Sequence, residues 1–371
     1  MTDRVLIIGG RGRIGSQVAA DIATHTQATI TITGRSQTAE LANPSLQYLS
    51  LDLENTASLK AAIQSSCDTG HTIVVHCAGP FQCRGTDVLD ACIAAGADYV
   101  DVSDHPSFTR QLRERREAAI AAGITAITNT GIFPGISNSM VRRDVEQLEK
   151  PEKIHLSYVV GGSGGAGITV MRTTFLGLRQ PFQAWIDKRW QTVMPYSGRE
   201  KVLFPPPYGP IGVYWFEMPE TFTLPETFPV TSVITKFGSA PDFYNHLTWS
   251  VAHWWPDWML KQPAVIEFLA QVSYAMTRFT DRLSGIGVAI RSQVTGYQNG
   301  QPTVVESTLI HPNTAISVGY GTGSVVQLLL SGALHQPGVW VVEEALPTQL
   351  FEQTMAQRGI QIEQNIYSYS E

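Results

Sequence analysis

Charged residues are scarce in this chain, and basic residues are not in excess. They make up 16% of the 371 positions, below the roughly 25% of typical soluble domains. The 26 Lys and Arg and the 32 Asp and Glu give a formal net charge of −6. We therefore expect no nucleic-acid partner, which would require a basic excess or a basic patch. Hydrophobic residues make up 43%, which predicts a globular chain with a large core and two or three domains.

Long apolar runs and cysteines are also few. No run reaches the roughly 18 apolar residues of a membrane-spanning helix, and residues 5–8 are too short for the apolar part of a signal peptide. The cysteines are Cys67, Cys77, Cys83 and Cys92, and no pair has C-x2-C spacing. We therefore expect buried or free thiols in a reducing compartment, a cytoplasmic location and no metal site.

Tryptophan is absent from the first 184 residues. Seven of the eight Trp fall between positions 185 and 258, and the eighth is Trp340. This distribution predicts two dissimilar parts of the chain, of which the second is rich in aromatic residues.

A glycine-rich turn near the N-terminus predicts a dinucleotide site. Residues 4–8 are typical of a buried parallel strand, and the apolar-periodic stretch up to residue 22 is typical of a helix. Between them lies a G-x-G-x-x-G spacing, which lets a backbone approach a pyrophosphate at a helix N-terminus. The residues predicted to bind the cofactor here are Gly9, Gly10, Gly12, Arg13, Ile14 and Gly15.

The end of the second predicted strand, residues 28–33, indicates which cofactor binds. An NAD site would place an Asp or Glu there for the ribose 2′-hydroxyl, but the chain continues Gly34-Arg35-Ser36. Arg35 can pair with a 2′-phosphate, and Ser36 adds a hydroxyl, so the pattern favours NADP(H). The alternative is that Arg35 is a solvated loop residue.

Two further segments are expected to contact the cofactor. Asp52 follows a third strand and is placed to contact the adenine, or else to cap a helix from about Ala57. The strand 72–76 ends in a turn of small residues at the sheet edge where the nicotinamide half belongs. The residues of that turn are Cys77, Ala78, Gly79 and Pro80.

Alternating strands and helices continue to residue 128 and predict an α/β fold with a doubly wound parallel sheet. With these motifs, the sequence resembles the saccharopine dehydrogenase-like (saccharopine reductase-like) NADP-binding family. The resemblance rests on residues 9–15, 34–35, 77–81 with Gly85 and Asp87, 99–101 and 131–135, and on residues 337–344 near the C-terminus.

The resemblance implies a domain organisation and an activity. Residues 1–135 would form the Rossmann domain, residues 136–334 an inserted central domain for substrate or oligomer contacts, and residues 335–371 a return to the Rossmann domain. The expected chemistry is NADPH-linked reduction or oxidation of a small molecule at a C–N or C=C centre, in a possible homodimer.

The central part is predicted to be α+β, with an antiparallel or mixed sheet. A hairpin turns at Asn299-Gly300 within residues 288–310. Helical spacing occurs in residues 243–258 and again from Pro263. The apolar face that we expect the second helix to bury consists of Val265, Phe268, Leu269, Val272, Met276, Phe279 and Leu283.

Candidate catalytic residues follow the fifth strand, at the carboxyl edge of the sheet. Asp104 and His105 are the candidates, because His105 has a suitable intrinsic pKa. The alternative role for Asp104 is to cap a helix that begins near Pro106. No Tyr-x-x-x-Lys pair is present, which excludes the usual short-chain dehydrogenase mechanism. The residues predicted to bind substrate are Phe81, Asn129, Phe133 and Asn138.

Three functions are compatible with these features. The first is an NADP(H)-dependent oxidoreductase with a bulky, partly apolar substrate, and the second is a non-catalytic NADP(H)-binding sensor or scaffold. The third is a peripheral membrane reductase of a lipid or pigment that uses residues 243–260. Only Lys261, His246 and His253 supply basic groups near that segment, so we rank it below a buried lid or a dimer contact.

Overall fold

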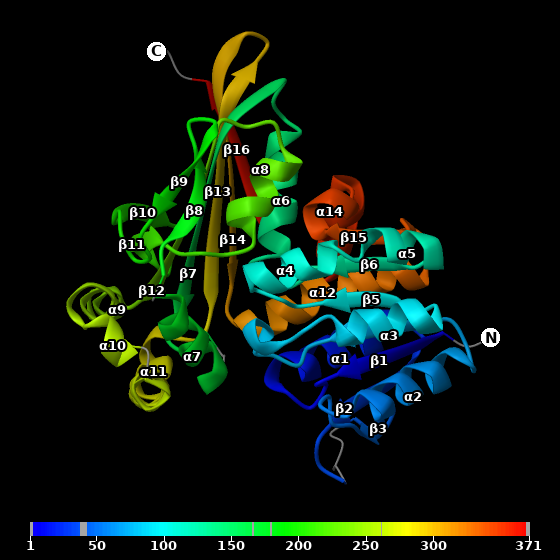
Figure 1. Ribbon diagram of the computed structural model, residues 1–371. Coiled ribbons are helices and arrows are strands. Elements are labelled where there is room, and N and C mark those ends of the chain that lie inside the picture. The colour runs from blue at the N-terminus through cyan, green and yellow to red at the C-terminus, as the bar shows by residue number, and fades with distance from the viewer. Residues whose placement is uncertain (1–2, 38–42, 165–166, 179, 261, 369–371) are drawn as a thin grey trace. The chain divides into compact units, whose positions relative to one another are not determined.

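The computed structural model describes residues 3–37, 43–164, 167–178, 180–260 and 262–368. The chain forms two compact units (Figure 1), each built from two segments. The first unit contains residues 1–136 and 315–358, and the second contains residues 137–314 and 359–371.

The first unit contains a seven-stranded, wholly parallel sheet in the order β15-β6-β5-β4-β1-β2-β3. The strands are β1 (Arg4–Ile8), β2 (Thr29–Gly34), β3 (Gln47–Ser50), β4 (Thr72–His76), β5 (Asp98–Asp101), β6 (Thr125–Thr128) and β15 (Gly338–Val341). The direction of strand progression reverses between β1 and β4, which is where such sheets bind ligands. The predicted doubly wound parallel sheet is confirmed.

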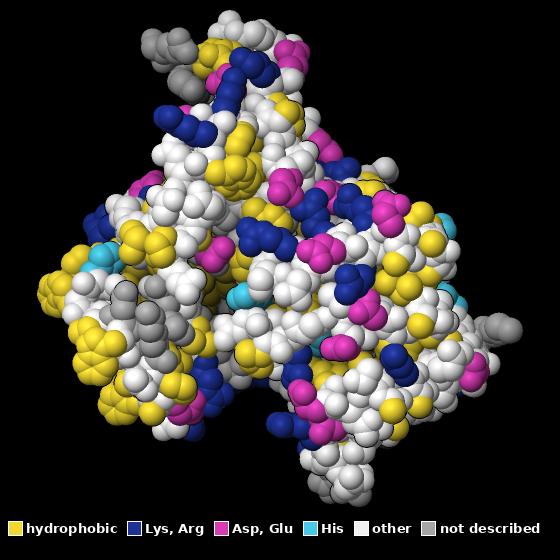
Figure 2. All heavy atoms as spheres, in the orientation of Figure 1, with side chains coloured by type: hydrophobic (Ala, Val, Ile, Leu, Met, Phe, Trp, Pro, Cys, Tyr) yellow, Lys and Arg dark blue, Asp and Glu magenta, His cyan; other side chains and the backbone are white. Residues whose placement is uncertain are grey.

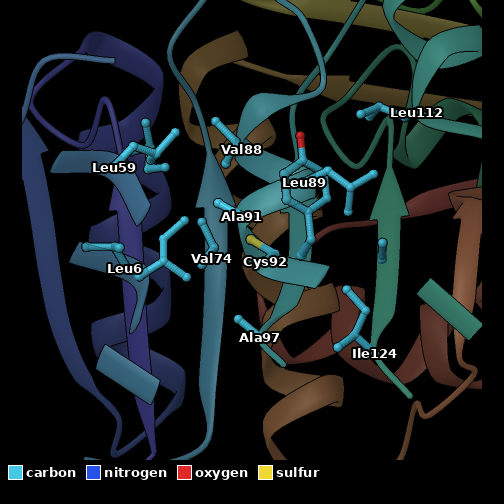
Figure 3. Close-up of a cluster of buried hydrophobic side chains, with 14 of the residues drawn as sticks. Leu6, Leu59, Val74, Val88, Leu89, Ala91, Cys92, Ala97, Leu112 and Ile124 are labelled. Atoms are coloured by element: carbon cyan, nitrogen blue, oxygen red, sulfur yellow. The ribbon is translucent and has the colours of Figure 1, made fainter. Parts of the chain in front are cut away.

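Helices connect these strands and supply the core of the first unit. They are α1 (Arg13–His25), α2 (Thr56–Cys67), α3 (Asp87–Ala95), α4 (Pro106–Arg113), α5 (Arg116–Ala122), α12 (Thr314–Leu330), α13 (Val342–Ala345) and α14 (Thr348–Gln357), with a 3-10 turn at Phe81–Cys83. Figure 3 shows one buried cluster, in which Leu6 and Val74 of the strands are joined by Leu59 of α2 and by Leu89 and Cys92 of α3. A buried leucine contributes about 1.5–3 kcal/mol, so this cluster holds the strand ends in fixed positions.

A buried ion pair fastens the last helix of the first unit to the first helix. Arg358, just after α14, donates from Nη2 to Asp21 Oδ2 of α1 at 2.6 Å and from Nε to Oδ1 at 3.0 Å. Its Nη1 also donates to Gln327 Oε1 of α12 at 2.9 Å. Both charged side chains are buried. The pair therefore joins three helices that lie far apart in the sequence.

The second unit contains a seven-stranded mixed sheet in the order β10-β11-β12-β7-β13-β14-β16, and a separate pair β8-β9. The strands are β7 (Lys150–Gly161), β8 (Phe182–Ile186), β9 (Arg189–Val193), β10 (Glu200–Phe204), β11 (Gly209–Trp215), β12 (Ser232–Ala240), β13 (Val288–Gln298), β14 (Gln301–His311) and β16 (Ile362–Ser368). Strands β12 and β7 pair in parallel, and the remaining neighbours are antiparallel. The predicted mixed sheet and the hairpin at Asn299-Gly300 are confirmed.

Helix α6 (Ile136–Val145) attaches to one face of this sheet through a buried carboxylate. Asp144 accepts from Ser292 Oγ at 2.6 Å, from Ser307 Oγ at 2.5 Å and from Gln364 Nε2 at 2.9 Å. These partners belong to β13, β14 and β16. Burial raises the pKa of Asp144 to about 6, although the three donors act against that shift.

The remaining helices of the second unit are α7 (Ile168–Gly177), α8 (Glu220–Thr227), α9 (Phe243–Trp254), α10 (Asp257–Leu260) and α11 (Pro263–Ser284). The inner sides of α7, α9, α10 and α11 meet in one cluster that includes Phe175, Val251, Leu260 and Ile266. The prediction that Phe268, Val272 and Phe279 of α11 are buried is wrong, because all three are exposed. The helix instead buries Ile266, Ala270 and Thr277.

Two segments group differently from the expected division at residues 135 and 334. Helix α12 is part of the first unit, although its sequence was assigned to the central part. Strand β16 pairs with β14 of the second unit instead of returning to the parallel sheet. The assignment of substrate or oligomer contacts to the second unit remains a prediction.

Candidate functional site

The carboxyl ends of β1 and β4 meet at the point where the strand order of the first unit reverses. Cys77 N donates to Ile8 O at 2.8 Å and so continues the pairing of these strands. Gly9 has a φ of +77°, and a Cβ there would lie 3.0 Å from Ala78 Cα. A side chain at Gly15 would place a Cβ 2.7 Å from Gly10 Cα, so only glycine lets α1 approach the turn this closely. The turn therefore carries no side chain over its backbone at Gly9, Gly10 and Gly12, and residues 9–15 are called the glycine cradle below.

Helix α1 begins in this cradle with an N-terminus that no side chain caps. Gly12 occupies the N-cap position, and Arg13 is the first helical residue. The first N–H groups of a helix lack partners within the helix and carry partial positive charge, which suits a phosphate. Arg11, Gly12 and Arg13 are exposed, so a ligand can reach these groups. The structure thus brings the predicted residues 9–15 together in a form that fits a pyrophosphate.

The end of β2 places a second basic side chain beside Arg35. A Cβ on Gly34 would lie 2.9 Å from Arg11 Cδ, so the Arg11 side chain passes directly over this strand end. The Arg11 guanidinium carbon lies 5.8 Å from the centre of the Tyr48 ring, and Tyr48 OH donates to Ser36 O at 2.5 Å. Arg35 and Ser36 are exposed. Tyr48 was missed from the sequence, since nothing in a lone tyrosine on a strand indicates this position.

Asp52 remains accessible to a ligand. The cap of α2 is Asn55, whose Oδ1 accepts from Ser58 N at 3.0 Å, so Asp52 does not take the alternative capping role. Asp52 is exposed, and its Oδ1 accepts from Glu54 N at 3.2 Å. Its contact with an adenine stays a prediction.

The turn after β4 is held by an arginine. Arg84 Nε donates to Ala78 O at 3.1 Å, and its Nη1 donates to Glu54 Oε1 at 3.0 Å. The peptide bond between Gly79 and Pro80 is cis. These contacts fix the backbone of residues 77–80 at the edge where the nicotinamide half of a dinucleotide would lie.

Phe81 follows this turn but points into the core. Its ring centre lies 5.1 Å from that of His76 and 5.0 Å from that of Phe108. Burial lowers the pKa of His76 to about 3, so this imidazole is neutral. These contacts favour a packing role for Phe81, and its predicted contact with substrate is untested.

Asp101, at the end of β5, organises the neighbouring strand ends. Its Oδ1 accepts from Ser103 N at 2.8 Å, from Thr128 Oγ1 at 3.0 Å and from Asn129 N at 3.1 Å. Burial raises the pKa of Asp101 to about 6. The sequence did not indicate Asp101 as a site residue, because nothing in it shows that one carboxylate oxygen accepts three hydrogen bonds.

Asn129 is engaged inside the first unit. It has a φ of +62°, and its Nδ2 donates to Ser103 O at 2.8 Å and to Thr109 Oγ1 at 3.0 Å. The side chain is buried. These bonds favour a positioning role for Asn129, and its predicted role in substrate binding is untested.

His105 and Asp104 lie at the start of α4. His105 is the N-cap residue and Pro106 the first helical residue, so the predicted helix start is confirmed but Asp104 is not its cap. His105 Nδ1 lies 2.9 Å from Ser107 Oγ, and the imidazole is half-buried. Burial lowers the pKa of His105 below its ordinary value. The Asp104 side chain is exposed.

The two remaining predicted substrate residues belong to different units. Phe133 lies in the turn after β6, is half-buried, and precedes the cis residue Pro134. Asn138 lies on α6 in the second unit, where its Oδ1 accepts from Ser137 Oγ at 3.0 Å. Nearby, Tyr158 OH donates to the buried carboxylate of Glu220 at 2.6 Å. Substrate contacts of Phe133 and Asn138 stay predictions.

The described residues offer neither a cluster of metal-binding side chains nor a helix that could span a membrane. Among these residues, no group of three or more His, Cys, Asp or Glu side chains is arranged to hold a metal ion. No helix in the described ranges is long and apolar enough to cross a membrane.

Comparison with known sequences agrees with the geometry of the first unit. Residues 5–127 match the family model described as the saccharopine dehydrogenase NADP binding domain. Over 81 residues the chain is 32% identical to saccharopine dehydrogenase-like oxidoreductases from Homo sapiens and from Pongo abelii. That segment covers 22% of this chain and 18% of either relative. The predicted resemblance is thus confirmed for the N-terminal part.

Comparison with solved structures extends the likeness of fold to both units. Apo saccharopine dehydrogenase (L-Glu forming) from Saccharomyces cerevisiae matches with a TM-score of 0.72 at 16% identity, covering 98% of this chain and 99% of that chain. DAP dehydrogenase from C. glutamicum in complex with DAP matches with a TM-score of 0.51 at 16% identity, covering 96% and 99%. At these identities the likeness concerns the fold alone.

Proposed function

We propose that this chain, whose residues 5–127 match the saccharopine dehydrogenase NADP binding domain, is an NADP(H)-dependent oxidoreductase. It transfers a hydride to or from a small-molecule substrate that is bulky and partly apolar, at a C–N or C=C centre. The observation that carries the proposal is the uncapped N-terminus of α1 in its glycine cradle, next to two arginines at the end of β2.

The two arginines support a cofactor with a 2′-phosphate. Arg35 follows β2 directly, and Arg11 is held beside the same strand end by the Tyr48 ring. A guanidinium gives charge-assisted bonds to a phosphate but would meet no matching charge on a ribose hydroxyl. The position therefore favours NADP(H) over NAD(H).

When bound, the dinucleotide would give or accept the hydride, and the residues of this chain would supply binding, orientation and a group that donates or accepts the proton. The α1 N-terminus would hold the pyrophosphate, and residues 77–80 would support the nicotinamide half. His105 is the proposed proton donor or acceptor, because its imidazole is half-buried and neutral at pH 7. Its Nδ1 is oriented by Ser107, which leaves Nε2 for a substrate. Asp101 and Asn129 position the strand ends that flank it.

Cofactor binding is tested by titration of the tryptophan fluorescence with NADPH and with NADH. Arg35→Ala should weaken NADPH about 10- to 100-fold, the range for loss of hydrogen bonds to a charged group, and should leave NADH nearly unchanged. Arg189→Ala, an exposed arginine on β9, is the matched control. If wild type fails to bind NADPH at micromolar concentration, the proposed function is refuted.

Turnover is tested separately on a panel of imines, enones and keto acids with bulky apolar groups. His105→Gln should lower kcat while the Kd for NADPH stays constant, and Asp104→Asn is the neighbouring comparison. Binding of NADPH without turnover of any panel member would support the sensor or scaffold function instead.

A further inference from the structure

Large apolar side chains are exposed on three neighbouring helices of the second unit. Trp254 of α9 is 74% exposed and Trp258 of α10 is 65% exposed. On α11, Phe268 is 61% exposed and Phe279 is 76% exposed. Figure 2 shows apolar side chains gathered over this part of the second unit. Isolated exposed hydrophobic residues are ordinary, but a contiguous group of this kind marks an interaction surface.

The exposed residues of α11 follow a helical repeat. Ala264, Phe268, Val272, Ala275 and Phe279 are all exposed and are spaced by four, four, three and four positions. Residues at this spacing lie on one face of a helix. The opposite side of α11 faces the protein through Ile266 and Ala270. The helix is therefore apolar on two sides, and the described residues of this chain cover one of them.

The row of exposed apolar residues on α11 is called the stripe below. The basic side chains beside it are exposed, whereas the acidic side chains of α11 bind other groups of the protein. Arg278 and Arg282 are exposed next to Phe279. The acidic residues of α11 are directed to other parts of the unit. Glu267 binds Arg172 through two bonds of 2.6 and 2.9 Å, and Asp281 accepts from Ser163 N and Oγ at 2.6 and 2.7 Å. Beside the stripe, Arg278 and Arg282 therefore add positive charge that no described acidic side chain pairs, whereas the partly exposed Glu267 is paired with Arg172.

We propose that the outer sides of α9, α10 and α11 bind the surface of an anionic lipid bilayer. Phenyl and indole rings favour the boundary between headgroups and acyl chains, and arginines beside them pair with anionic headgroups. A second copy of the chain fits the charges less well. An isologous contact would bring Arg278 and Arg282 of both copies to one interface, where like charges repel.

The proposal is tested by sedimentation of the full chain with sucrose-loaded phosphatidylcholine vesicles, with and without phosphatidylglycerol. Wild type should sediment with the anionic vesicles, and added salt should weaken the binding. Phe268→Ser with Phe279→Ser should lower the partition coefficient at least about tenfold. Arg278→Gln with Arg282→Gln should remove the preference for anionic vesicles. Leu203→Ser, which alters a 71% exposed leucine of β10, is the matched control and should bind like wild type.

A second readout uses the exposed tryptophans. Brominated lipids should quench wild-type fluorescence, and Trp254→Phe with Trp258→Phe should remove most of that quenching. Thermal unfolding followed by circular dichroism verifies that each variant folds. Wild-type protein that stays in the supernatant with both kinds of vesicle refutes the proposal. A dimer detected by light scattering without lipid also refutes the proposal, if the double variant Phe268→Ser with Phe279→Ser is a monomer.

Discussion

Replacing Arg358 by methionine should destabilise the first unit more than almost any other change at a single side chain. Arg358→Met keeps much of the side-chain volume but leaves the buried Asp21 carboxylate without its arginine, with His25 Nδ1 at 3.3 Å as its remaining ion-pair neighbour. Removing one partner of a buried ion pair costs about 3–5 kcal/mol, because the remaining charge is desolvated and uncompensated. The link to Gln327 of α12 is lost as well.

The assay is calorimetric unfolding, with hydrogen exchange of α1 and α14 to assign the transition to the first unit. For a unit of this size, each 1 kcal/mol lowers Tm by about 2–4 °C, so Arg358→Met should lower it by about 6–20 °C. In this variant burial raises the pKa of Asp21 above its ordinary 3.8. The folded state then takes up a proton more readily than the unfolded state, so the loss of stability should shrink as the pH falls.

Asp21→Asn combined with Arg358→Met is the decisive comparison, because it removes the unpaired charge. The double variant should regain at least half of the stability lost by Arg358→Met. A loss below about 1 kcal/mol for the single variant would refute the reasoning. A double variant as unstable as the single one would also refute it, since the loss would then come from packing alone.

Substitutions at three further positions test other contacts. Gly15→Val should weaken NADPH at least about tenfold in the fluorescence titration, because a Cβ at this position collides with the backbone of Gly9 and Gly10. Asp144 has a pKa of about 6 in the fold against an ordinary 3.8, so its stability contribution is lost as pH rises through about 6. Asp144→Asn should reduce the change in the free energy of unfolding between pH 4 and pH 8, measured by urea titration, by up to about 3 kcal/mol. Asn129→Ala should lower stability by about 2–3 kcal/mol in urea, and Asn129→Gly by less, because glycine tolerates the φ of +62°.

Local pattern was sufficient to predict the N-terminal segment of the first unit, but not the place of α12 in that unit. The strand, glycine turn and helix of residues 4–25 carry their own signals, because a parallel strand is uniformly apolar and the turn requires glycine. The hairpin at Asn299-Gly300 was predictable for the same reason, since both residues take a positive φ. The pairing of β16 with β14 was not predictable, because residues 362–368 are mostly exposed and carry little apolar pattern.

The candidate site was predictable by position but not by contact. Strand ends of a parallel sheet meet at one edge, and residues 77–80, Asp104 and His105 do follow the ends of β4 and β5, while their roles stay predictions. The partners of Asp101 come from three separate segments, and no spacing in the sequence encodes them. Helix α11 was also mispredicted. Its periodicity identifies apolar faces but does not tell which of them packs against the rest of the protein.

The division of the chain into interleaved segments has a consequence during synthesis. Strand β6 ends at Thr128, but its neighbour β15 begins only at Gly338. At about 5–20 residues per second, a ribosome needs about 10–40 s to make the intervening chain. Throughout that time the nascent sheet has an unpaired edge at β6, which is a hazard for aggregation. A chaperone that shields this edge should therefore raise the yield of folded protein more than one that acts only after release.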